Sequence, residues 1–156
     1  MKDNLIFNFY HMTIRKMLLS DLEMCSQILE KEYSKDPYFE SFQKESSLKY
    51  LESKFLKNQE TSFVIEENKK IVGFCISSLS HWTDGLQAII EEIVIDSDFQ
   101  GLGYGKKIYF YVENFLKDLG VKSLMLWVQN DANAFNFHLK NGYFKSDEHS
   151  VMFKNL

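Results

Sequence analysis

The chain has 156 residues, which is enough for one domain with its own hydrophobic core. Hydrophobic residues make up 45% of the sequence and charged residues 26%, a composition that is typical of a globular protein and excludes a disordered one. The formal net charge of −4 argues against a nucleic-acid-binding protein, which needs a clustered basic surface, and favours a cationic partner.

No window approaches the ~20 consecutive apolar residues that a membrane-spanning helix needs. Residues 1–11 lack the apolar stretch and cleavage site of a signal peptide, so we expect no membrane contact and a cytoplasmic location. We interpret residues 1–11 as an N-terminal extension and residues 12–156 as a single domain. Cys25 and Cys75 lie far apart in apolar stretches and have no metal or redox spacing, which predicts two buried core thiols and no metal site.

The first predicted strand covers residues 13–17, and a helix over residues 20–33 follows it. Ser20 and Glu23 form a capping box, which predicts that Ser20 is the N-cap of this helix. Pro37 then excludes helical continuation, because proline disfavours helical geometry in the residue before it.

A second helix is predicted over residues 47–56. Strands over residues 62–66 and 71–79 follow, and the polar residues 67–70 between them favour an antiparallel hairpin. Residues 81–85 are typical of a loop.

A fourth strand is predicted over residues 87–95, and after a glycine cluster the apolar residues recur at helical spacing as far as Gly120, a natural C′ residue. The fourth strand, this helix and the next strand form one parallel crossover unit. The remaining predicted elements are a strand over residues 123–128, a helix over residues 131–140 and terminal strands over residues 143–153.

Glycines at positions 101, 103 and 105 come directly after the fourth strand and open the next helix. Glycines let successive backbone N–H groups converge, and a helix N-terminus adds partial positive charge, so this segment predicts an anion-binding cradle. The spacing excludes a mononucleotide P-loop, because Gln100 and Lys107 stand where a glycine and a Ser or Thr are required. It also excludes a dinucleotide fingerprint, because Lys106 replaces the third glycine.

The stretch from Gln100 to Gly105 resembles the pyrophosphate-binding signature Arg/Gln-x-x-Gly-x-Gly/Ala of the GNAT acetyltransferases. A second stretch resembles the family's next conserved block, through a Leu-Trp-Val strand at residues 126–128, Ala134 and the pair Gly142-Tyr143. With weaker motifs, the resemblance extends over nearly the whole chain after Met12. It implies an α/β (α+β) fold in which helices flank a mixed, splayed central sheet and acetyl-CoA lies between strands four and five.

The resemblance also implies which residues bind acetyl-CoA. The backbone of the fourth strand would hydrogen-bond the pantetheine arm through Ile93, Val94 and Ile95. Backbone N–H groups would hold the pyrophosphate at Gln100, Gly101, Leu102, Gly103, Tyr104, Gly105 and Lys106. The last helix would flank the thioester through Asp131, Ala134 and Phe137, although Asp131 stands where the family usually has Asn.

Transfer to a protonated amine needs a base, and Glu91 and Glu92 are the candidates. Neighbours on a strand point to opposite faces, so only one faces the acceptor unless a bulge intervenes. A similar acidic pair in polyamine acetyltransferases favours Glu91. The N–H of Val94 is a candidate donor to the developing oxyanion. His138 stands where the family has a tyrosine acid, and it either protonates the leaving thiolate or only contacts the cofactor or solvent.

Acids alternate with aromatic residues between the two N-terminal helices, over residues 32–40, which suits an aliphatic cation. We therefore expect an N-acetyltransferase that moves the acetyl group directly from acetyl-CoA to a primary amine of a small cationic molecule, such as a polyamine or an aminoglycoside. The alternatives are an acyl-CoA-binding module without turnover and a protein or peptide N-acetyltransferase. A homodimer stays open, and the histidines at positions 11, 81 and 149 are expected at the surface.

Overall fold

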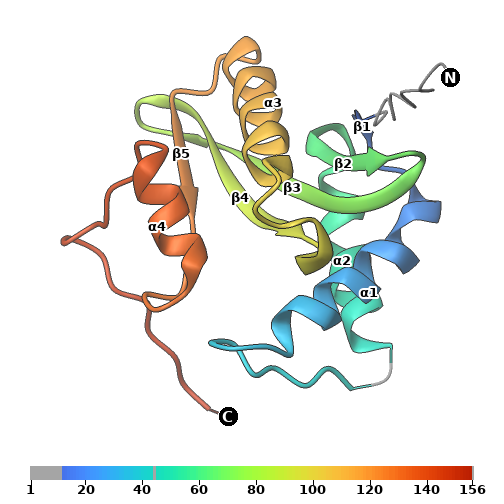
Figure 1. The fold of residues 1–156 in the computed structure, drawn as a ribbon. Helices are drawn as coiled ribbons and strands as arrows, with labels where there is room; N and C mark the ends of the chain where they lie inside the picture. The colour runs from blue at the N-terminus through green and yellow to red at the C-terminus, as the bar shows by residue number, and fades with distance from the viewer. Residues whose placement is uncertain (1–11, 44, 156) are drawn as a thin grey trace, which may run out of the picture.

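The computed structural model describes residues 12–43 and 45–155, so the predicted extension lies outside the described residues. Five strands form one sheet in the order β1-β2-β3-β4-β5, and four α-helices pack around it (Figure 1). The elements are β1 (Met12–Lys16), α1 (Leu22–Tyr33), α2 (Ser46–Lys57), β2 (Ser62–Glu67), β3 (Lys70–Trp82), β4 (Gly85–Ile95), α3 (Tyr104–Asp118), β5 (Ser123–Leu126) and α4 (Asn133–Lys140).

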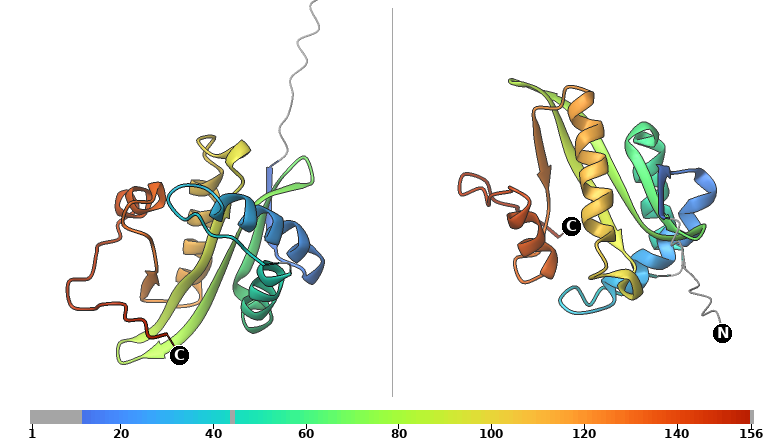
Figure 2. Two further views of the ribbon diagram at one scale, coloured as in Figure 1. Left: turned by 90° about the horizontal axis from the view of Figure 1, so that it is seen from below. Right: turned by 45° about the horizontal axis from the view of Figure 1, so that its top comes forward.

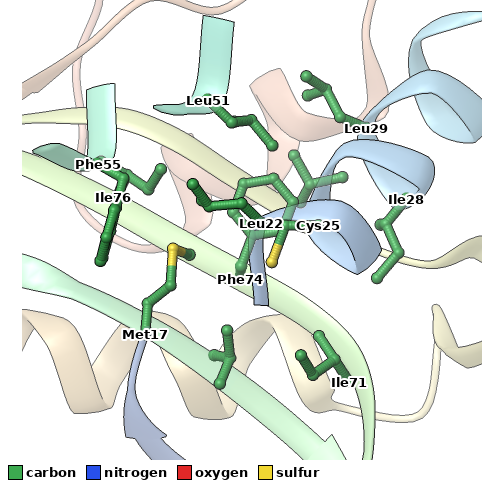
Figure 3. Packing of buried hydrophobic residues seen from close by; sticks show 12 residues of the cluster. Met17, Leu22, Cys25, Ile28, Leu29, Leu51, Phe55, Ile71, Phe74 and Ile76 are labelled. Carbon is green, nitrogen blue, oxygen red and sulfur yellow. The ribbon is translucent and has the colours of Figure 1, made fainter. Parts of the chain in front are cut away.

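The sheet separates two hydrophobic clusters, which lie under different helices. Helices α1 and α2 cover one face and α3 covers the other (Figure 2). The α1–α2 cluster includes the buried Cys25 beside Leu22 and Phe74 (Figure 3), and the α3 cluster includes Cys75. The prediction of two buried cysteines is confirmed.

The α1 helix begins later than predicted, because Asp21 and not Ser20 organises its start. The Asp21 carboxylate accepts the N–H of Leu18 at 2.7 Å and forms two hydrogen bonds with the Arg15 guanidinium. A short 3-10 helix (Leu19–Asp21) therefore precedes the α-helix, and the predicted Ser20 cap is wrong.

The hairpin between β2 and β3 is confirmed, and its turn residues Asn68 and Lys69 both have positive φ, as a type I′ turn requires. The predicted loop over residues 81–85 is too long, because its end residues belong to strands β3 and β4. Trp82 pairs with Gly85, so β3 and β4 continue to a two-residue turn. Hairpin pairing satisfies the backbone there even though the side chains are exposed.

Strands β1 to β4 are antiparallel, whereas β4 and β5 are parallel and joined through α3, as the crossover unit predicts. Gly120 has a φ of 87° directly after the C-cap of α3, which confirms it as the C′ residue.

The predicted terminal strands over residues 143–153 are wrong, because the described residues after α4 form no strand. Phe144 is 86% exposed and Phe153 92% exposed. A polar run, residues 145–150, separates these apolar side chains, so the segment has no continuous apolar face to bury against the sheet.

No helix among the described residues is long and apolar enough to cross a membrane.

Candidate active site

The sheet opens between β4 and β5. Their last pair is Ile90 with Leu126, and β4 then continues to Ile95 while the chain after β5 turns away. A cavity of about 80 Å³ lies at this divergence. Its lining residues come from β4, from the α1–α2 side and from the chain around α4: Tyr33, Tyr38, Ile90, Glu91, Glu92, Ile93, Leu126, Trp127, Val128, Gln129, Ala134 and His138.

A β-bulge places both candidate carboxylates on one face of β4. Ile76 pairs with Glu92 while the next β3 residue, Ser77, pairs with Ile90, so Glu91 is the extra residue of the bulge. Both side chains therefore point towards α1 and α2, where their hydrogen-bond partners lie. The usual alternation of side chains along a strand, which would let only one of Glu91 and Glu92 face the acceptor, is interrupted by this bulge.

Glu92 is the more deeply buried carboxylate, with 8% of the residue exposed. Tyr33 donates to one of its oxygens at 2.9 Å and Tyr50 donates to the other at 2.5 Å. Burial raises the pKa of Glu92 above its usual value, although the two phenol hydrogen bonds oppose this rise. Tyr38 stacks on Tyr33 with 4.8 Å between ring centroids, so aromatic rings enclose this carboxylate.

Glu91 has the opposite electrostatic environment. Lys54 of α2 lies 2.5 Å from one of its oxygens, and Ser78 donates to the other at 2.6 Å. Burial raises the pKa of Glu91, but the hydrogen bonds from Lys54 and Ser78 outweigh burial and hold this pKa below its usual value. Glu91 is thus an ionised partner of Lys54, while the hydrogen-bond partners of Glu92 among the described residues include no cation.

Beyond the divergence, alternate residues of β4 direct their backbone groups away from β3. The Asp96 N–H donates to the Val72 carbonyl at 2.9 Å, and strand alternation turns the N–H of Val94 to the same side. Ile93 and Ile95 therefore direct their polar groups to the open side. The Val94 N–H is therefore directed towards β3, against the expectation that it donates to an oxyanion, and the Ile93 N–H lies on the open side.

The glycine loop, residues 96–103, runs from the end of β4 to the start of α3. Gly101 and Gly103 have φ values of 75° and 88°, and a Cβ at either position would point into open space. The first N–H groups of α3 have no acceptors within the helix. Gln100 is an exception in the predicted cradle, because its N–H donates to the Ser97 carbonyl at 3.3 Å. The two positive-φ glycines before a helix N-terminus are compatible with the predicted anion cradle, which stays a prediction.

The remaining cradle residues, Leu102 and Lys106, are exposed beside the loop, whereas the side chain of Tyr104 is buried and donates to Glu67 at 2.5 Å. Gly105 packs closely on β4, where an added Cβ would lie 3.5 Å from Ile95.

His138 lies in the cavity with 5% of the residue exposed. Its Nδ1 atom is buried and has no hydrogen-bond partner among the described residues. Burial lowers the pKa of His138, so the imidazole is neutral at neutral pH. A neutral imidazole acts through one N–H and one lone pair, and it has no net charge to neutralise a thiolate.

The other residues predicted on α4 separate into two groups. Ala134 lines the cavity with His138. Asp131 is exposed before the helix begins, and Phe137 packs against Tyr109 of α3 with 5.8 Å between ring centroids. Neither of these two lines the cavity.

Sequence reasoning missed the contribution of α2. Tyr50 and Lys54 lie one helical turn apart, which places them on the same face of the helix, and this spacing was the available signal. Gln129 also donates to the Pro37 carbonyl at 3.2 Å and joins the loop after β5 to the loop after α1.

The site suits a pantetheine thioester that ends in phosphates. Backbone donors and acceptors on the open side of β4 would bind an extended amide chain, and the glycine loop lies at the end of that strand. The cavity with both carboxylates lies at the other end of the open stretch.

Two curated relatives are uncharacterized N-acetyltransferases. One from Pyropia yezoensis is 30% identical over 83 residues, which are 53% of this chain and 45% of the relative. One from Methanocaldococcus jannaschii is 26% identical over 136 residues, which are 84% of this chain and 60% of the relative. The chain thus spans about half of the length of the curated relatives it matches.

Solved structures share the fold at low sequence identity. A possible acetyltransferase from Clostridium difficile 630 superposes with a TM-score of 0.78 at 16% identity, covering 93% of this chain and 98% of that one. An aminoglycoside N-acetyltransferase in complex with CoA superposes with a TM-score of 0.72 at 18% identity, covering 97% and 99%. These structures confirm a mixed, splayed sheet flanked by helices.

The family model described as the acetyltransferase (GNAT) family matches residues 22–143, a stretch that includes β4, the glycine loop and α4. The chain therefore belongs to the GNAT family of acetyltransferases.

Proposed function

We propose that the protein transfers the acetyl group of acetyl-CoA directly to a primary amine of a small cationic molecule, with Glu92 as the general base. The observation that carries this proposal is the bulge in β4. It places a buried carboxylate, whose hydrogen-bond donors in the described part of the chain are two phenols, beside the cavity where the sheet opens. Aminoglycoside acetyltransferases among the structural neighbours support a small-molecule amine as the acceptor class.

Acetyl-CoA supplies an activated acetyl group as a thioester. Its phosphates would bind at the glycine loop and its pantetheine arm along Ile93 and Ile95. An aliphatic ammonium has a pKa of ~10, so a base must remove its proton before the nitrogen can attack. The raised pKa of Glu92 makes it a stronger base than an ordinary carboxylate, and the surrounding aromatic rings favour a cation.

The other groups have supporting roles in this proposal. The Ile93 N–H would donate to the carbonyl oxygen of the thioester, where negative charge develops during attack. The neutral His138 imidazole would position the leaving sulfur through its N–H, and a proton from Glu92 or water completes the exchange. The cytoplasmic location and the homodimer stay predictions from the sequence.

The first experiment is a calorimetric titration with acetyl-CoA of the wild type and of two variants of Gly103. Gly103→Glu puts an anion into the cradle, whereas Gly103→Ala imposes the same backbone strain at positive φ without charge. We expect saturable binding by the wild type, weaker binding by Gly103→Ala and loss of binding by Gly103→Glu.

Thiol release with a panel of primary amines then separates the alternatives. An amine acetyltransferase releases CoA only when an acceptor is present. A protein that binds acetyl-CoA and releases no thiol with any amine or peptide is a binding module, and preference for a peptide over free amines indicates a protein acetyltransferase. Absence of acetyl-CoA binding by the wild type would overturn the proposal.

A further inference from the structure

Side chains in the last turn of α1 form a set of long-range polar contacts with the glycine loop. The Glu32 carboxylate accepts the N–H of Ser97 at 2.9 Å and the side-chain amide of Gln100 at 3.2 Å. Lys31 bridges Asp96 at 2.5 Å and Asp98 at 2.9 Å. These contacts join residues about 65 positions apart in the sequence, so they fix the loop against a helix and not only within itself.

Gln100, the first residue of the pyrophosphate signature, lies at an exposed position, but its donors have partners within the protein. Its side-chain amide donates both to Glu32 and to the Ile95 carbonyl at 2.8 Å, and its backbone N–H donates to Ser97. An amide nitrogen carries two hydrogens, so no donor of Gln100 is left for a phosphate. In this arrangement Gln100 connects α1 to the end of β4.

We propose that Glu32 is a positioning residue for acetyl-CoA, which acts through Gln100 and Ser97 to hold the glycine loop in its binding shape without touching the ligand. The inference rests on the proposed function. The Glu32 side chain is only 11% exposed and its oxygens accept from the loop. Lys35 contacts both Glu32 at 3.0 Å and the Ser97 hydroxyl at 2.5 Å, which completes the support.

The sign of the effect separates positioning from simple electrostatics. Glu32 is a negative charge near an anion-binding loop, so through-space repulsion alone would make its removal strengthen acetyl-CoA binding. Loss of positioning would instead weaken binding, because ordering the loop around the ligand then costs conformational entropy. We expect Glu32→Ala to weaken acetyl-CoA binding by about tenfold or more.

The experiment measures the affinity of Glu32→Ala for acetyl-CoA and for S-acetylpantetheine, which carries the same thioester arm without phosphates. Only the phosphate-containing ligand should lose affinity, and the affinity for S-acetylpantetheine, measured by competition, should change by less than about threefold. Glu23→Ala is the matched control, because it removes an exposed carboxylate from the same helix. Thermal unfolding of each variant shows whether it is folded.

Gln100→Ala provides a second variant at an exposed position. Because Gln100 supports the loop through its contact with Glu32, we expect the double variant to bind acetyl-CoA about as weakly as Glu32→Ala alone. Unchanged or tighter binding by Glu32→Ala, equal losses for both ligands, or additive losses in the double variant would each overturn the inference while leaving the proposed function intact. Absence of acetyl-CoA binding by the wild type would instead remove the proposed function.

Discussion

At the scale of single residues, two adjacent carboxylates have different environments. Glu91 lies against Lys54, whereas Glu92 accepts two phenol hydrogen bonds in a buried pocket. Their pKa values are shifted in opposite directions, Glu91 downwards and Glu92 upwards. Divergence of this kind within a carboxylate pair is how active sites assign acid and base roles, and it favours Glu92 over Glu91 as the base.

Glu92→Gln tests this assignment. We expect turnover to fall by about 10²–10⁴-fold, because the base is lost while the shape is kept. In the wild type, kcat/KM should rise with pH through the raised pKa of Glu92, and the variant should lack this limb. Glu91→Gln should keep the limb and move it to lower pH, because the charge of Glu91 raises the pKa of Glu92.

The same variant makes a prediction for stability. Folding raises the pKa of Glu92, so its contribution to stability is present when it is protonated and is lost as pH rises through the raised pKa. Glu92→Gln should therefore unfold at a higher temperature than the wild type above that pKa, and the difference should vanish in acid. A constant difference across pH would contradict the shift.

His138→Phe tests the role of the imidazole. The substitution keeps a planar ring in the cavity and removes the nitrogen atoms, so we expect slower transfer with little change in acetyl-CoA affinity. Because burial lowers the pKa of His138, the wild-type pH profile should show no loss of activity that follows deprotonation near pH ~6.5. Unchanged turnover in the variant would show that His138 only contacts the cofactor or solvent and takes no part in the transfer.

At the scale of elements, the position of β4 in the site depends on its close packing against β3. Gly73 pairs with Ile95, and a Cβ at position 73 would lie 2.7 Å from the Val94 carbonyl oxygen. That contact is with backbone, which cannot rotate away. The absence of a side chain at this position allows β4 to reach the glycine loop in register.

Gly73→Ala should therefore displace β4 and destabilise the fold by about 1–3 kcal/mol, the usual cost of overpacking. The measurement is chemical denaturation, with Ser80→Ala at an exposed position of the same strand as the control. Acetyl-CoA affinity should fall together with stability in Gly73→Ala. Equal stability of the two variants would show that β4 tolerates the extra carbon.

At the scale of the whole molecule, the site draws on both layers around the sheet. The carboxylates and their partners lie on the α1–α2 side, the glycine loop opens α3, and His138 comes from α4. A ligand that spans these parts would contact all of these elements at once. Binding should therefore stabilise the native state as one unit.

We expect acetyl-CoA at about 100 times its Kd to stabilise the native state by about 2.7 kcal/mol. For a chain of this size, the unfolding temperature should then rise by roughly 5–11 °C. Differential scanning fluorimetry at several acetyl-CoA concentrations measures the shift, and Gly103→Glu should show none. An unchanged wild-type unfolding temperature would contradict binding to the folded state.

The sequence by itself determined the local features of this protein. Apolar periodicity predicted α3, polar composition predicted the β2–β3 turn, and Gly120 was predicted as the C′ residue, because each of these features depends on neighbouring residues. The anion cradle, inferred from the strand–glycine–helix order, stays a prediction. The shared face of Glu91 and Glu92 was decided only by tertiary structure, since a bulge depends on the register between β3 and β4. The partners of these carboxylates were likewise beyond local reasoning, because Tyr50 and Lys54 reach them across about 40 residues of chain. The predicted Ser20 cap failed for a local reason, because the neighbouring Asp21 carboxylate accepts the Leu18 N–H and binds Arg15 in place of the Ser20 hydroxyl.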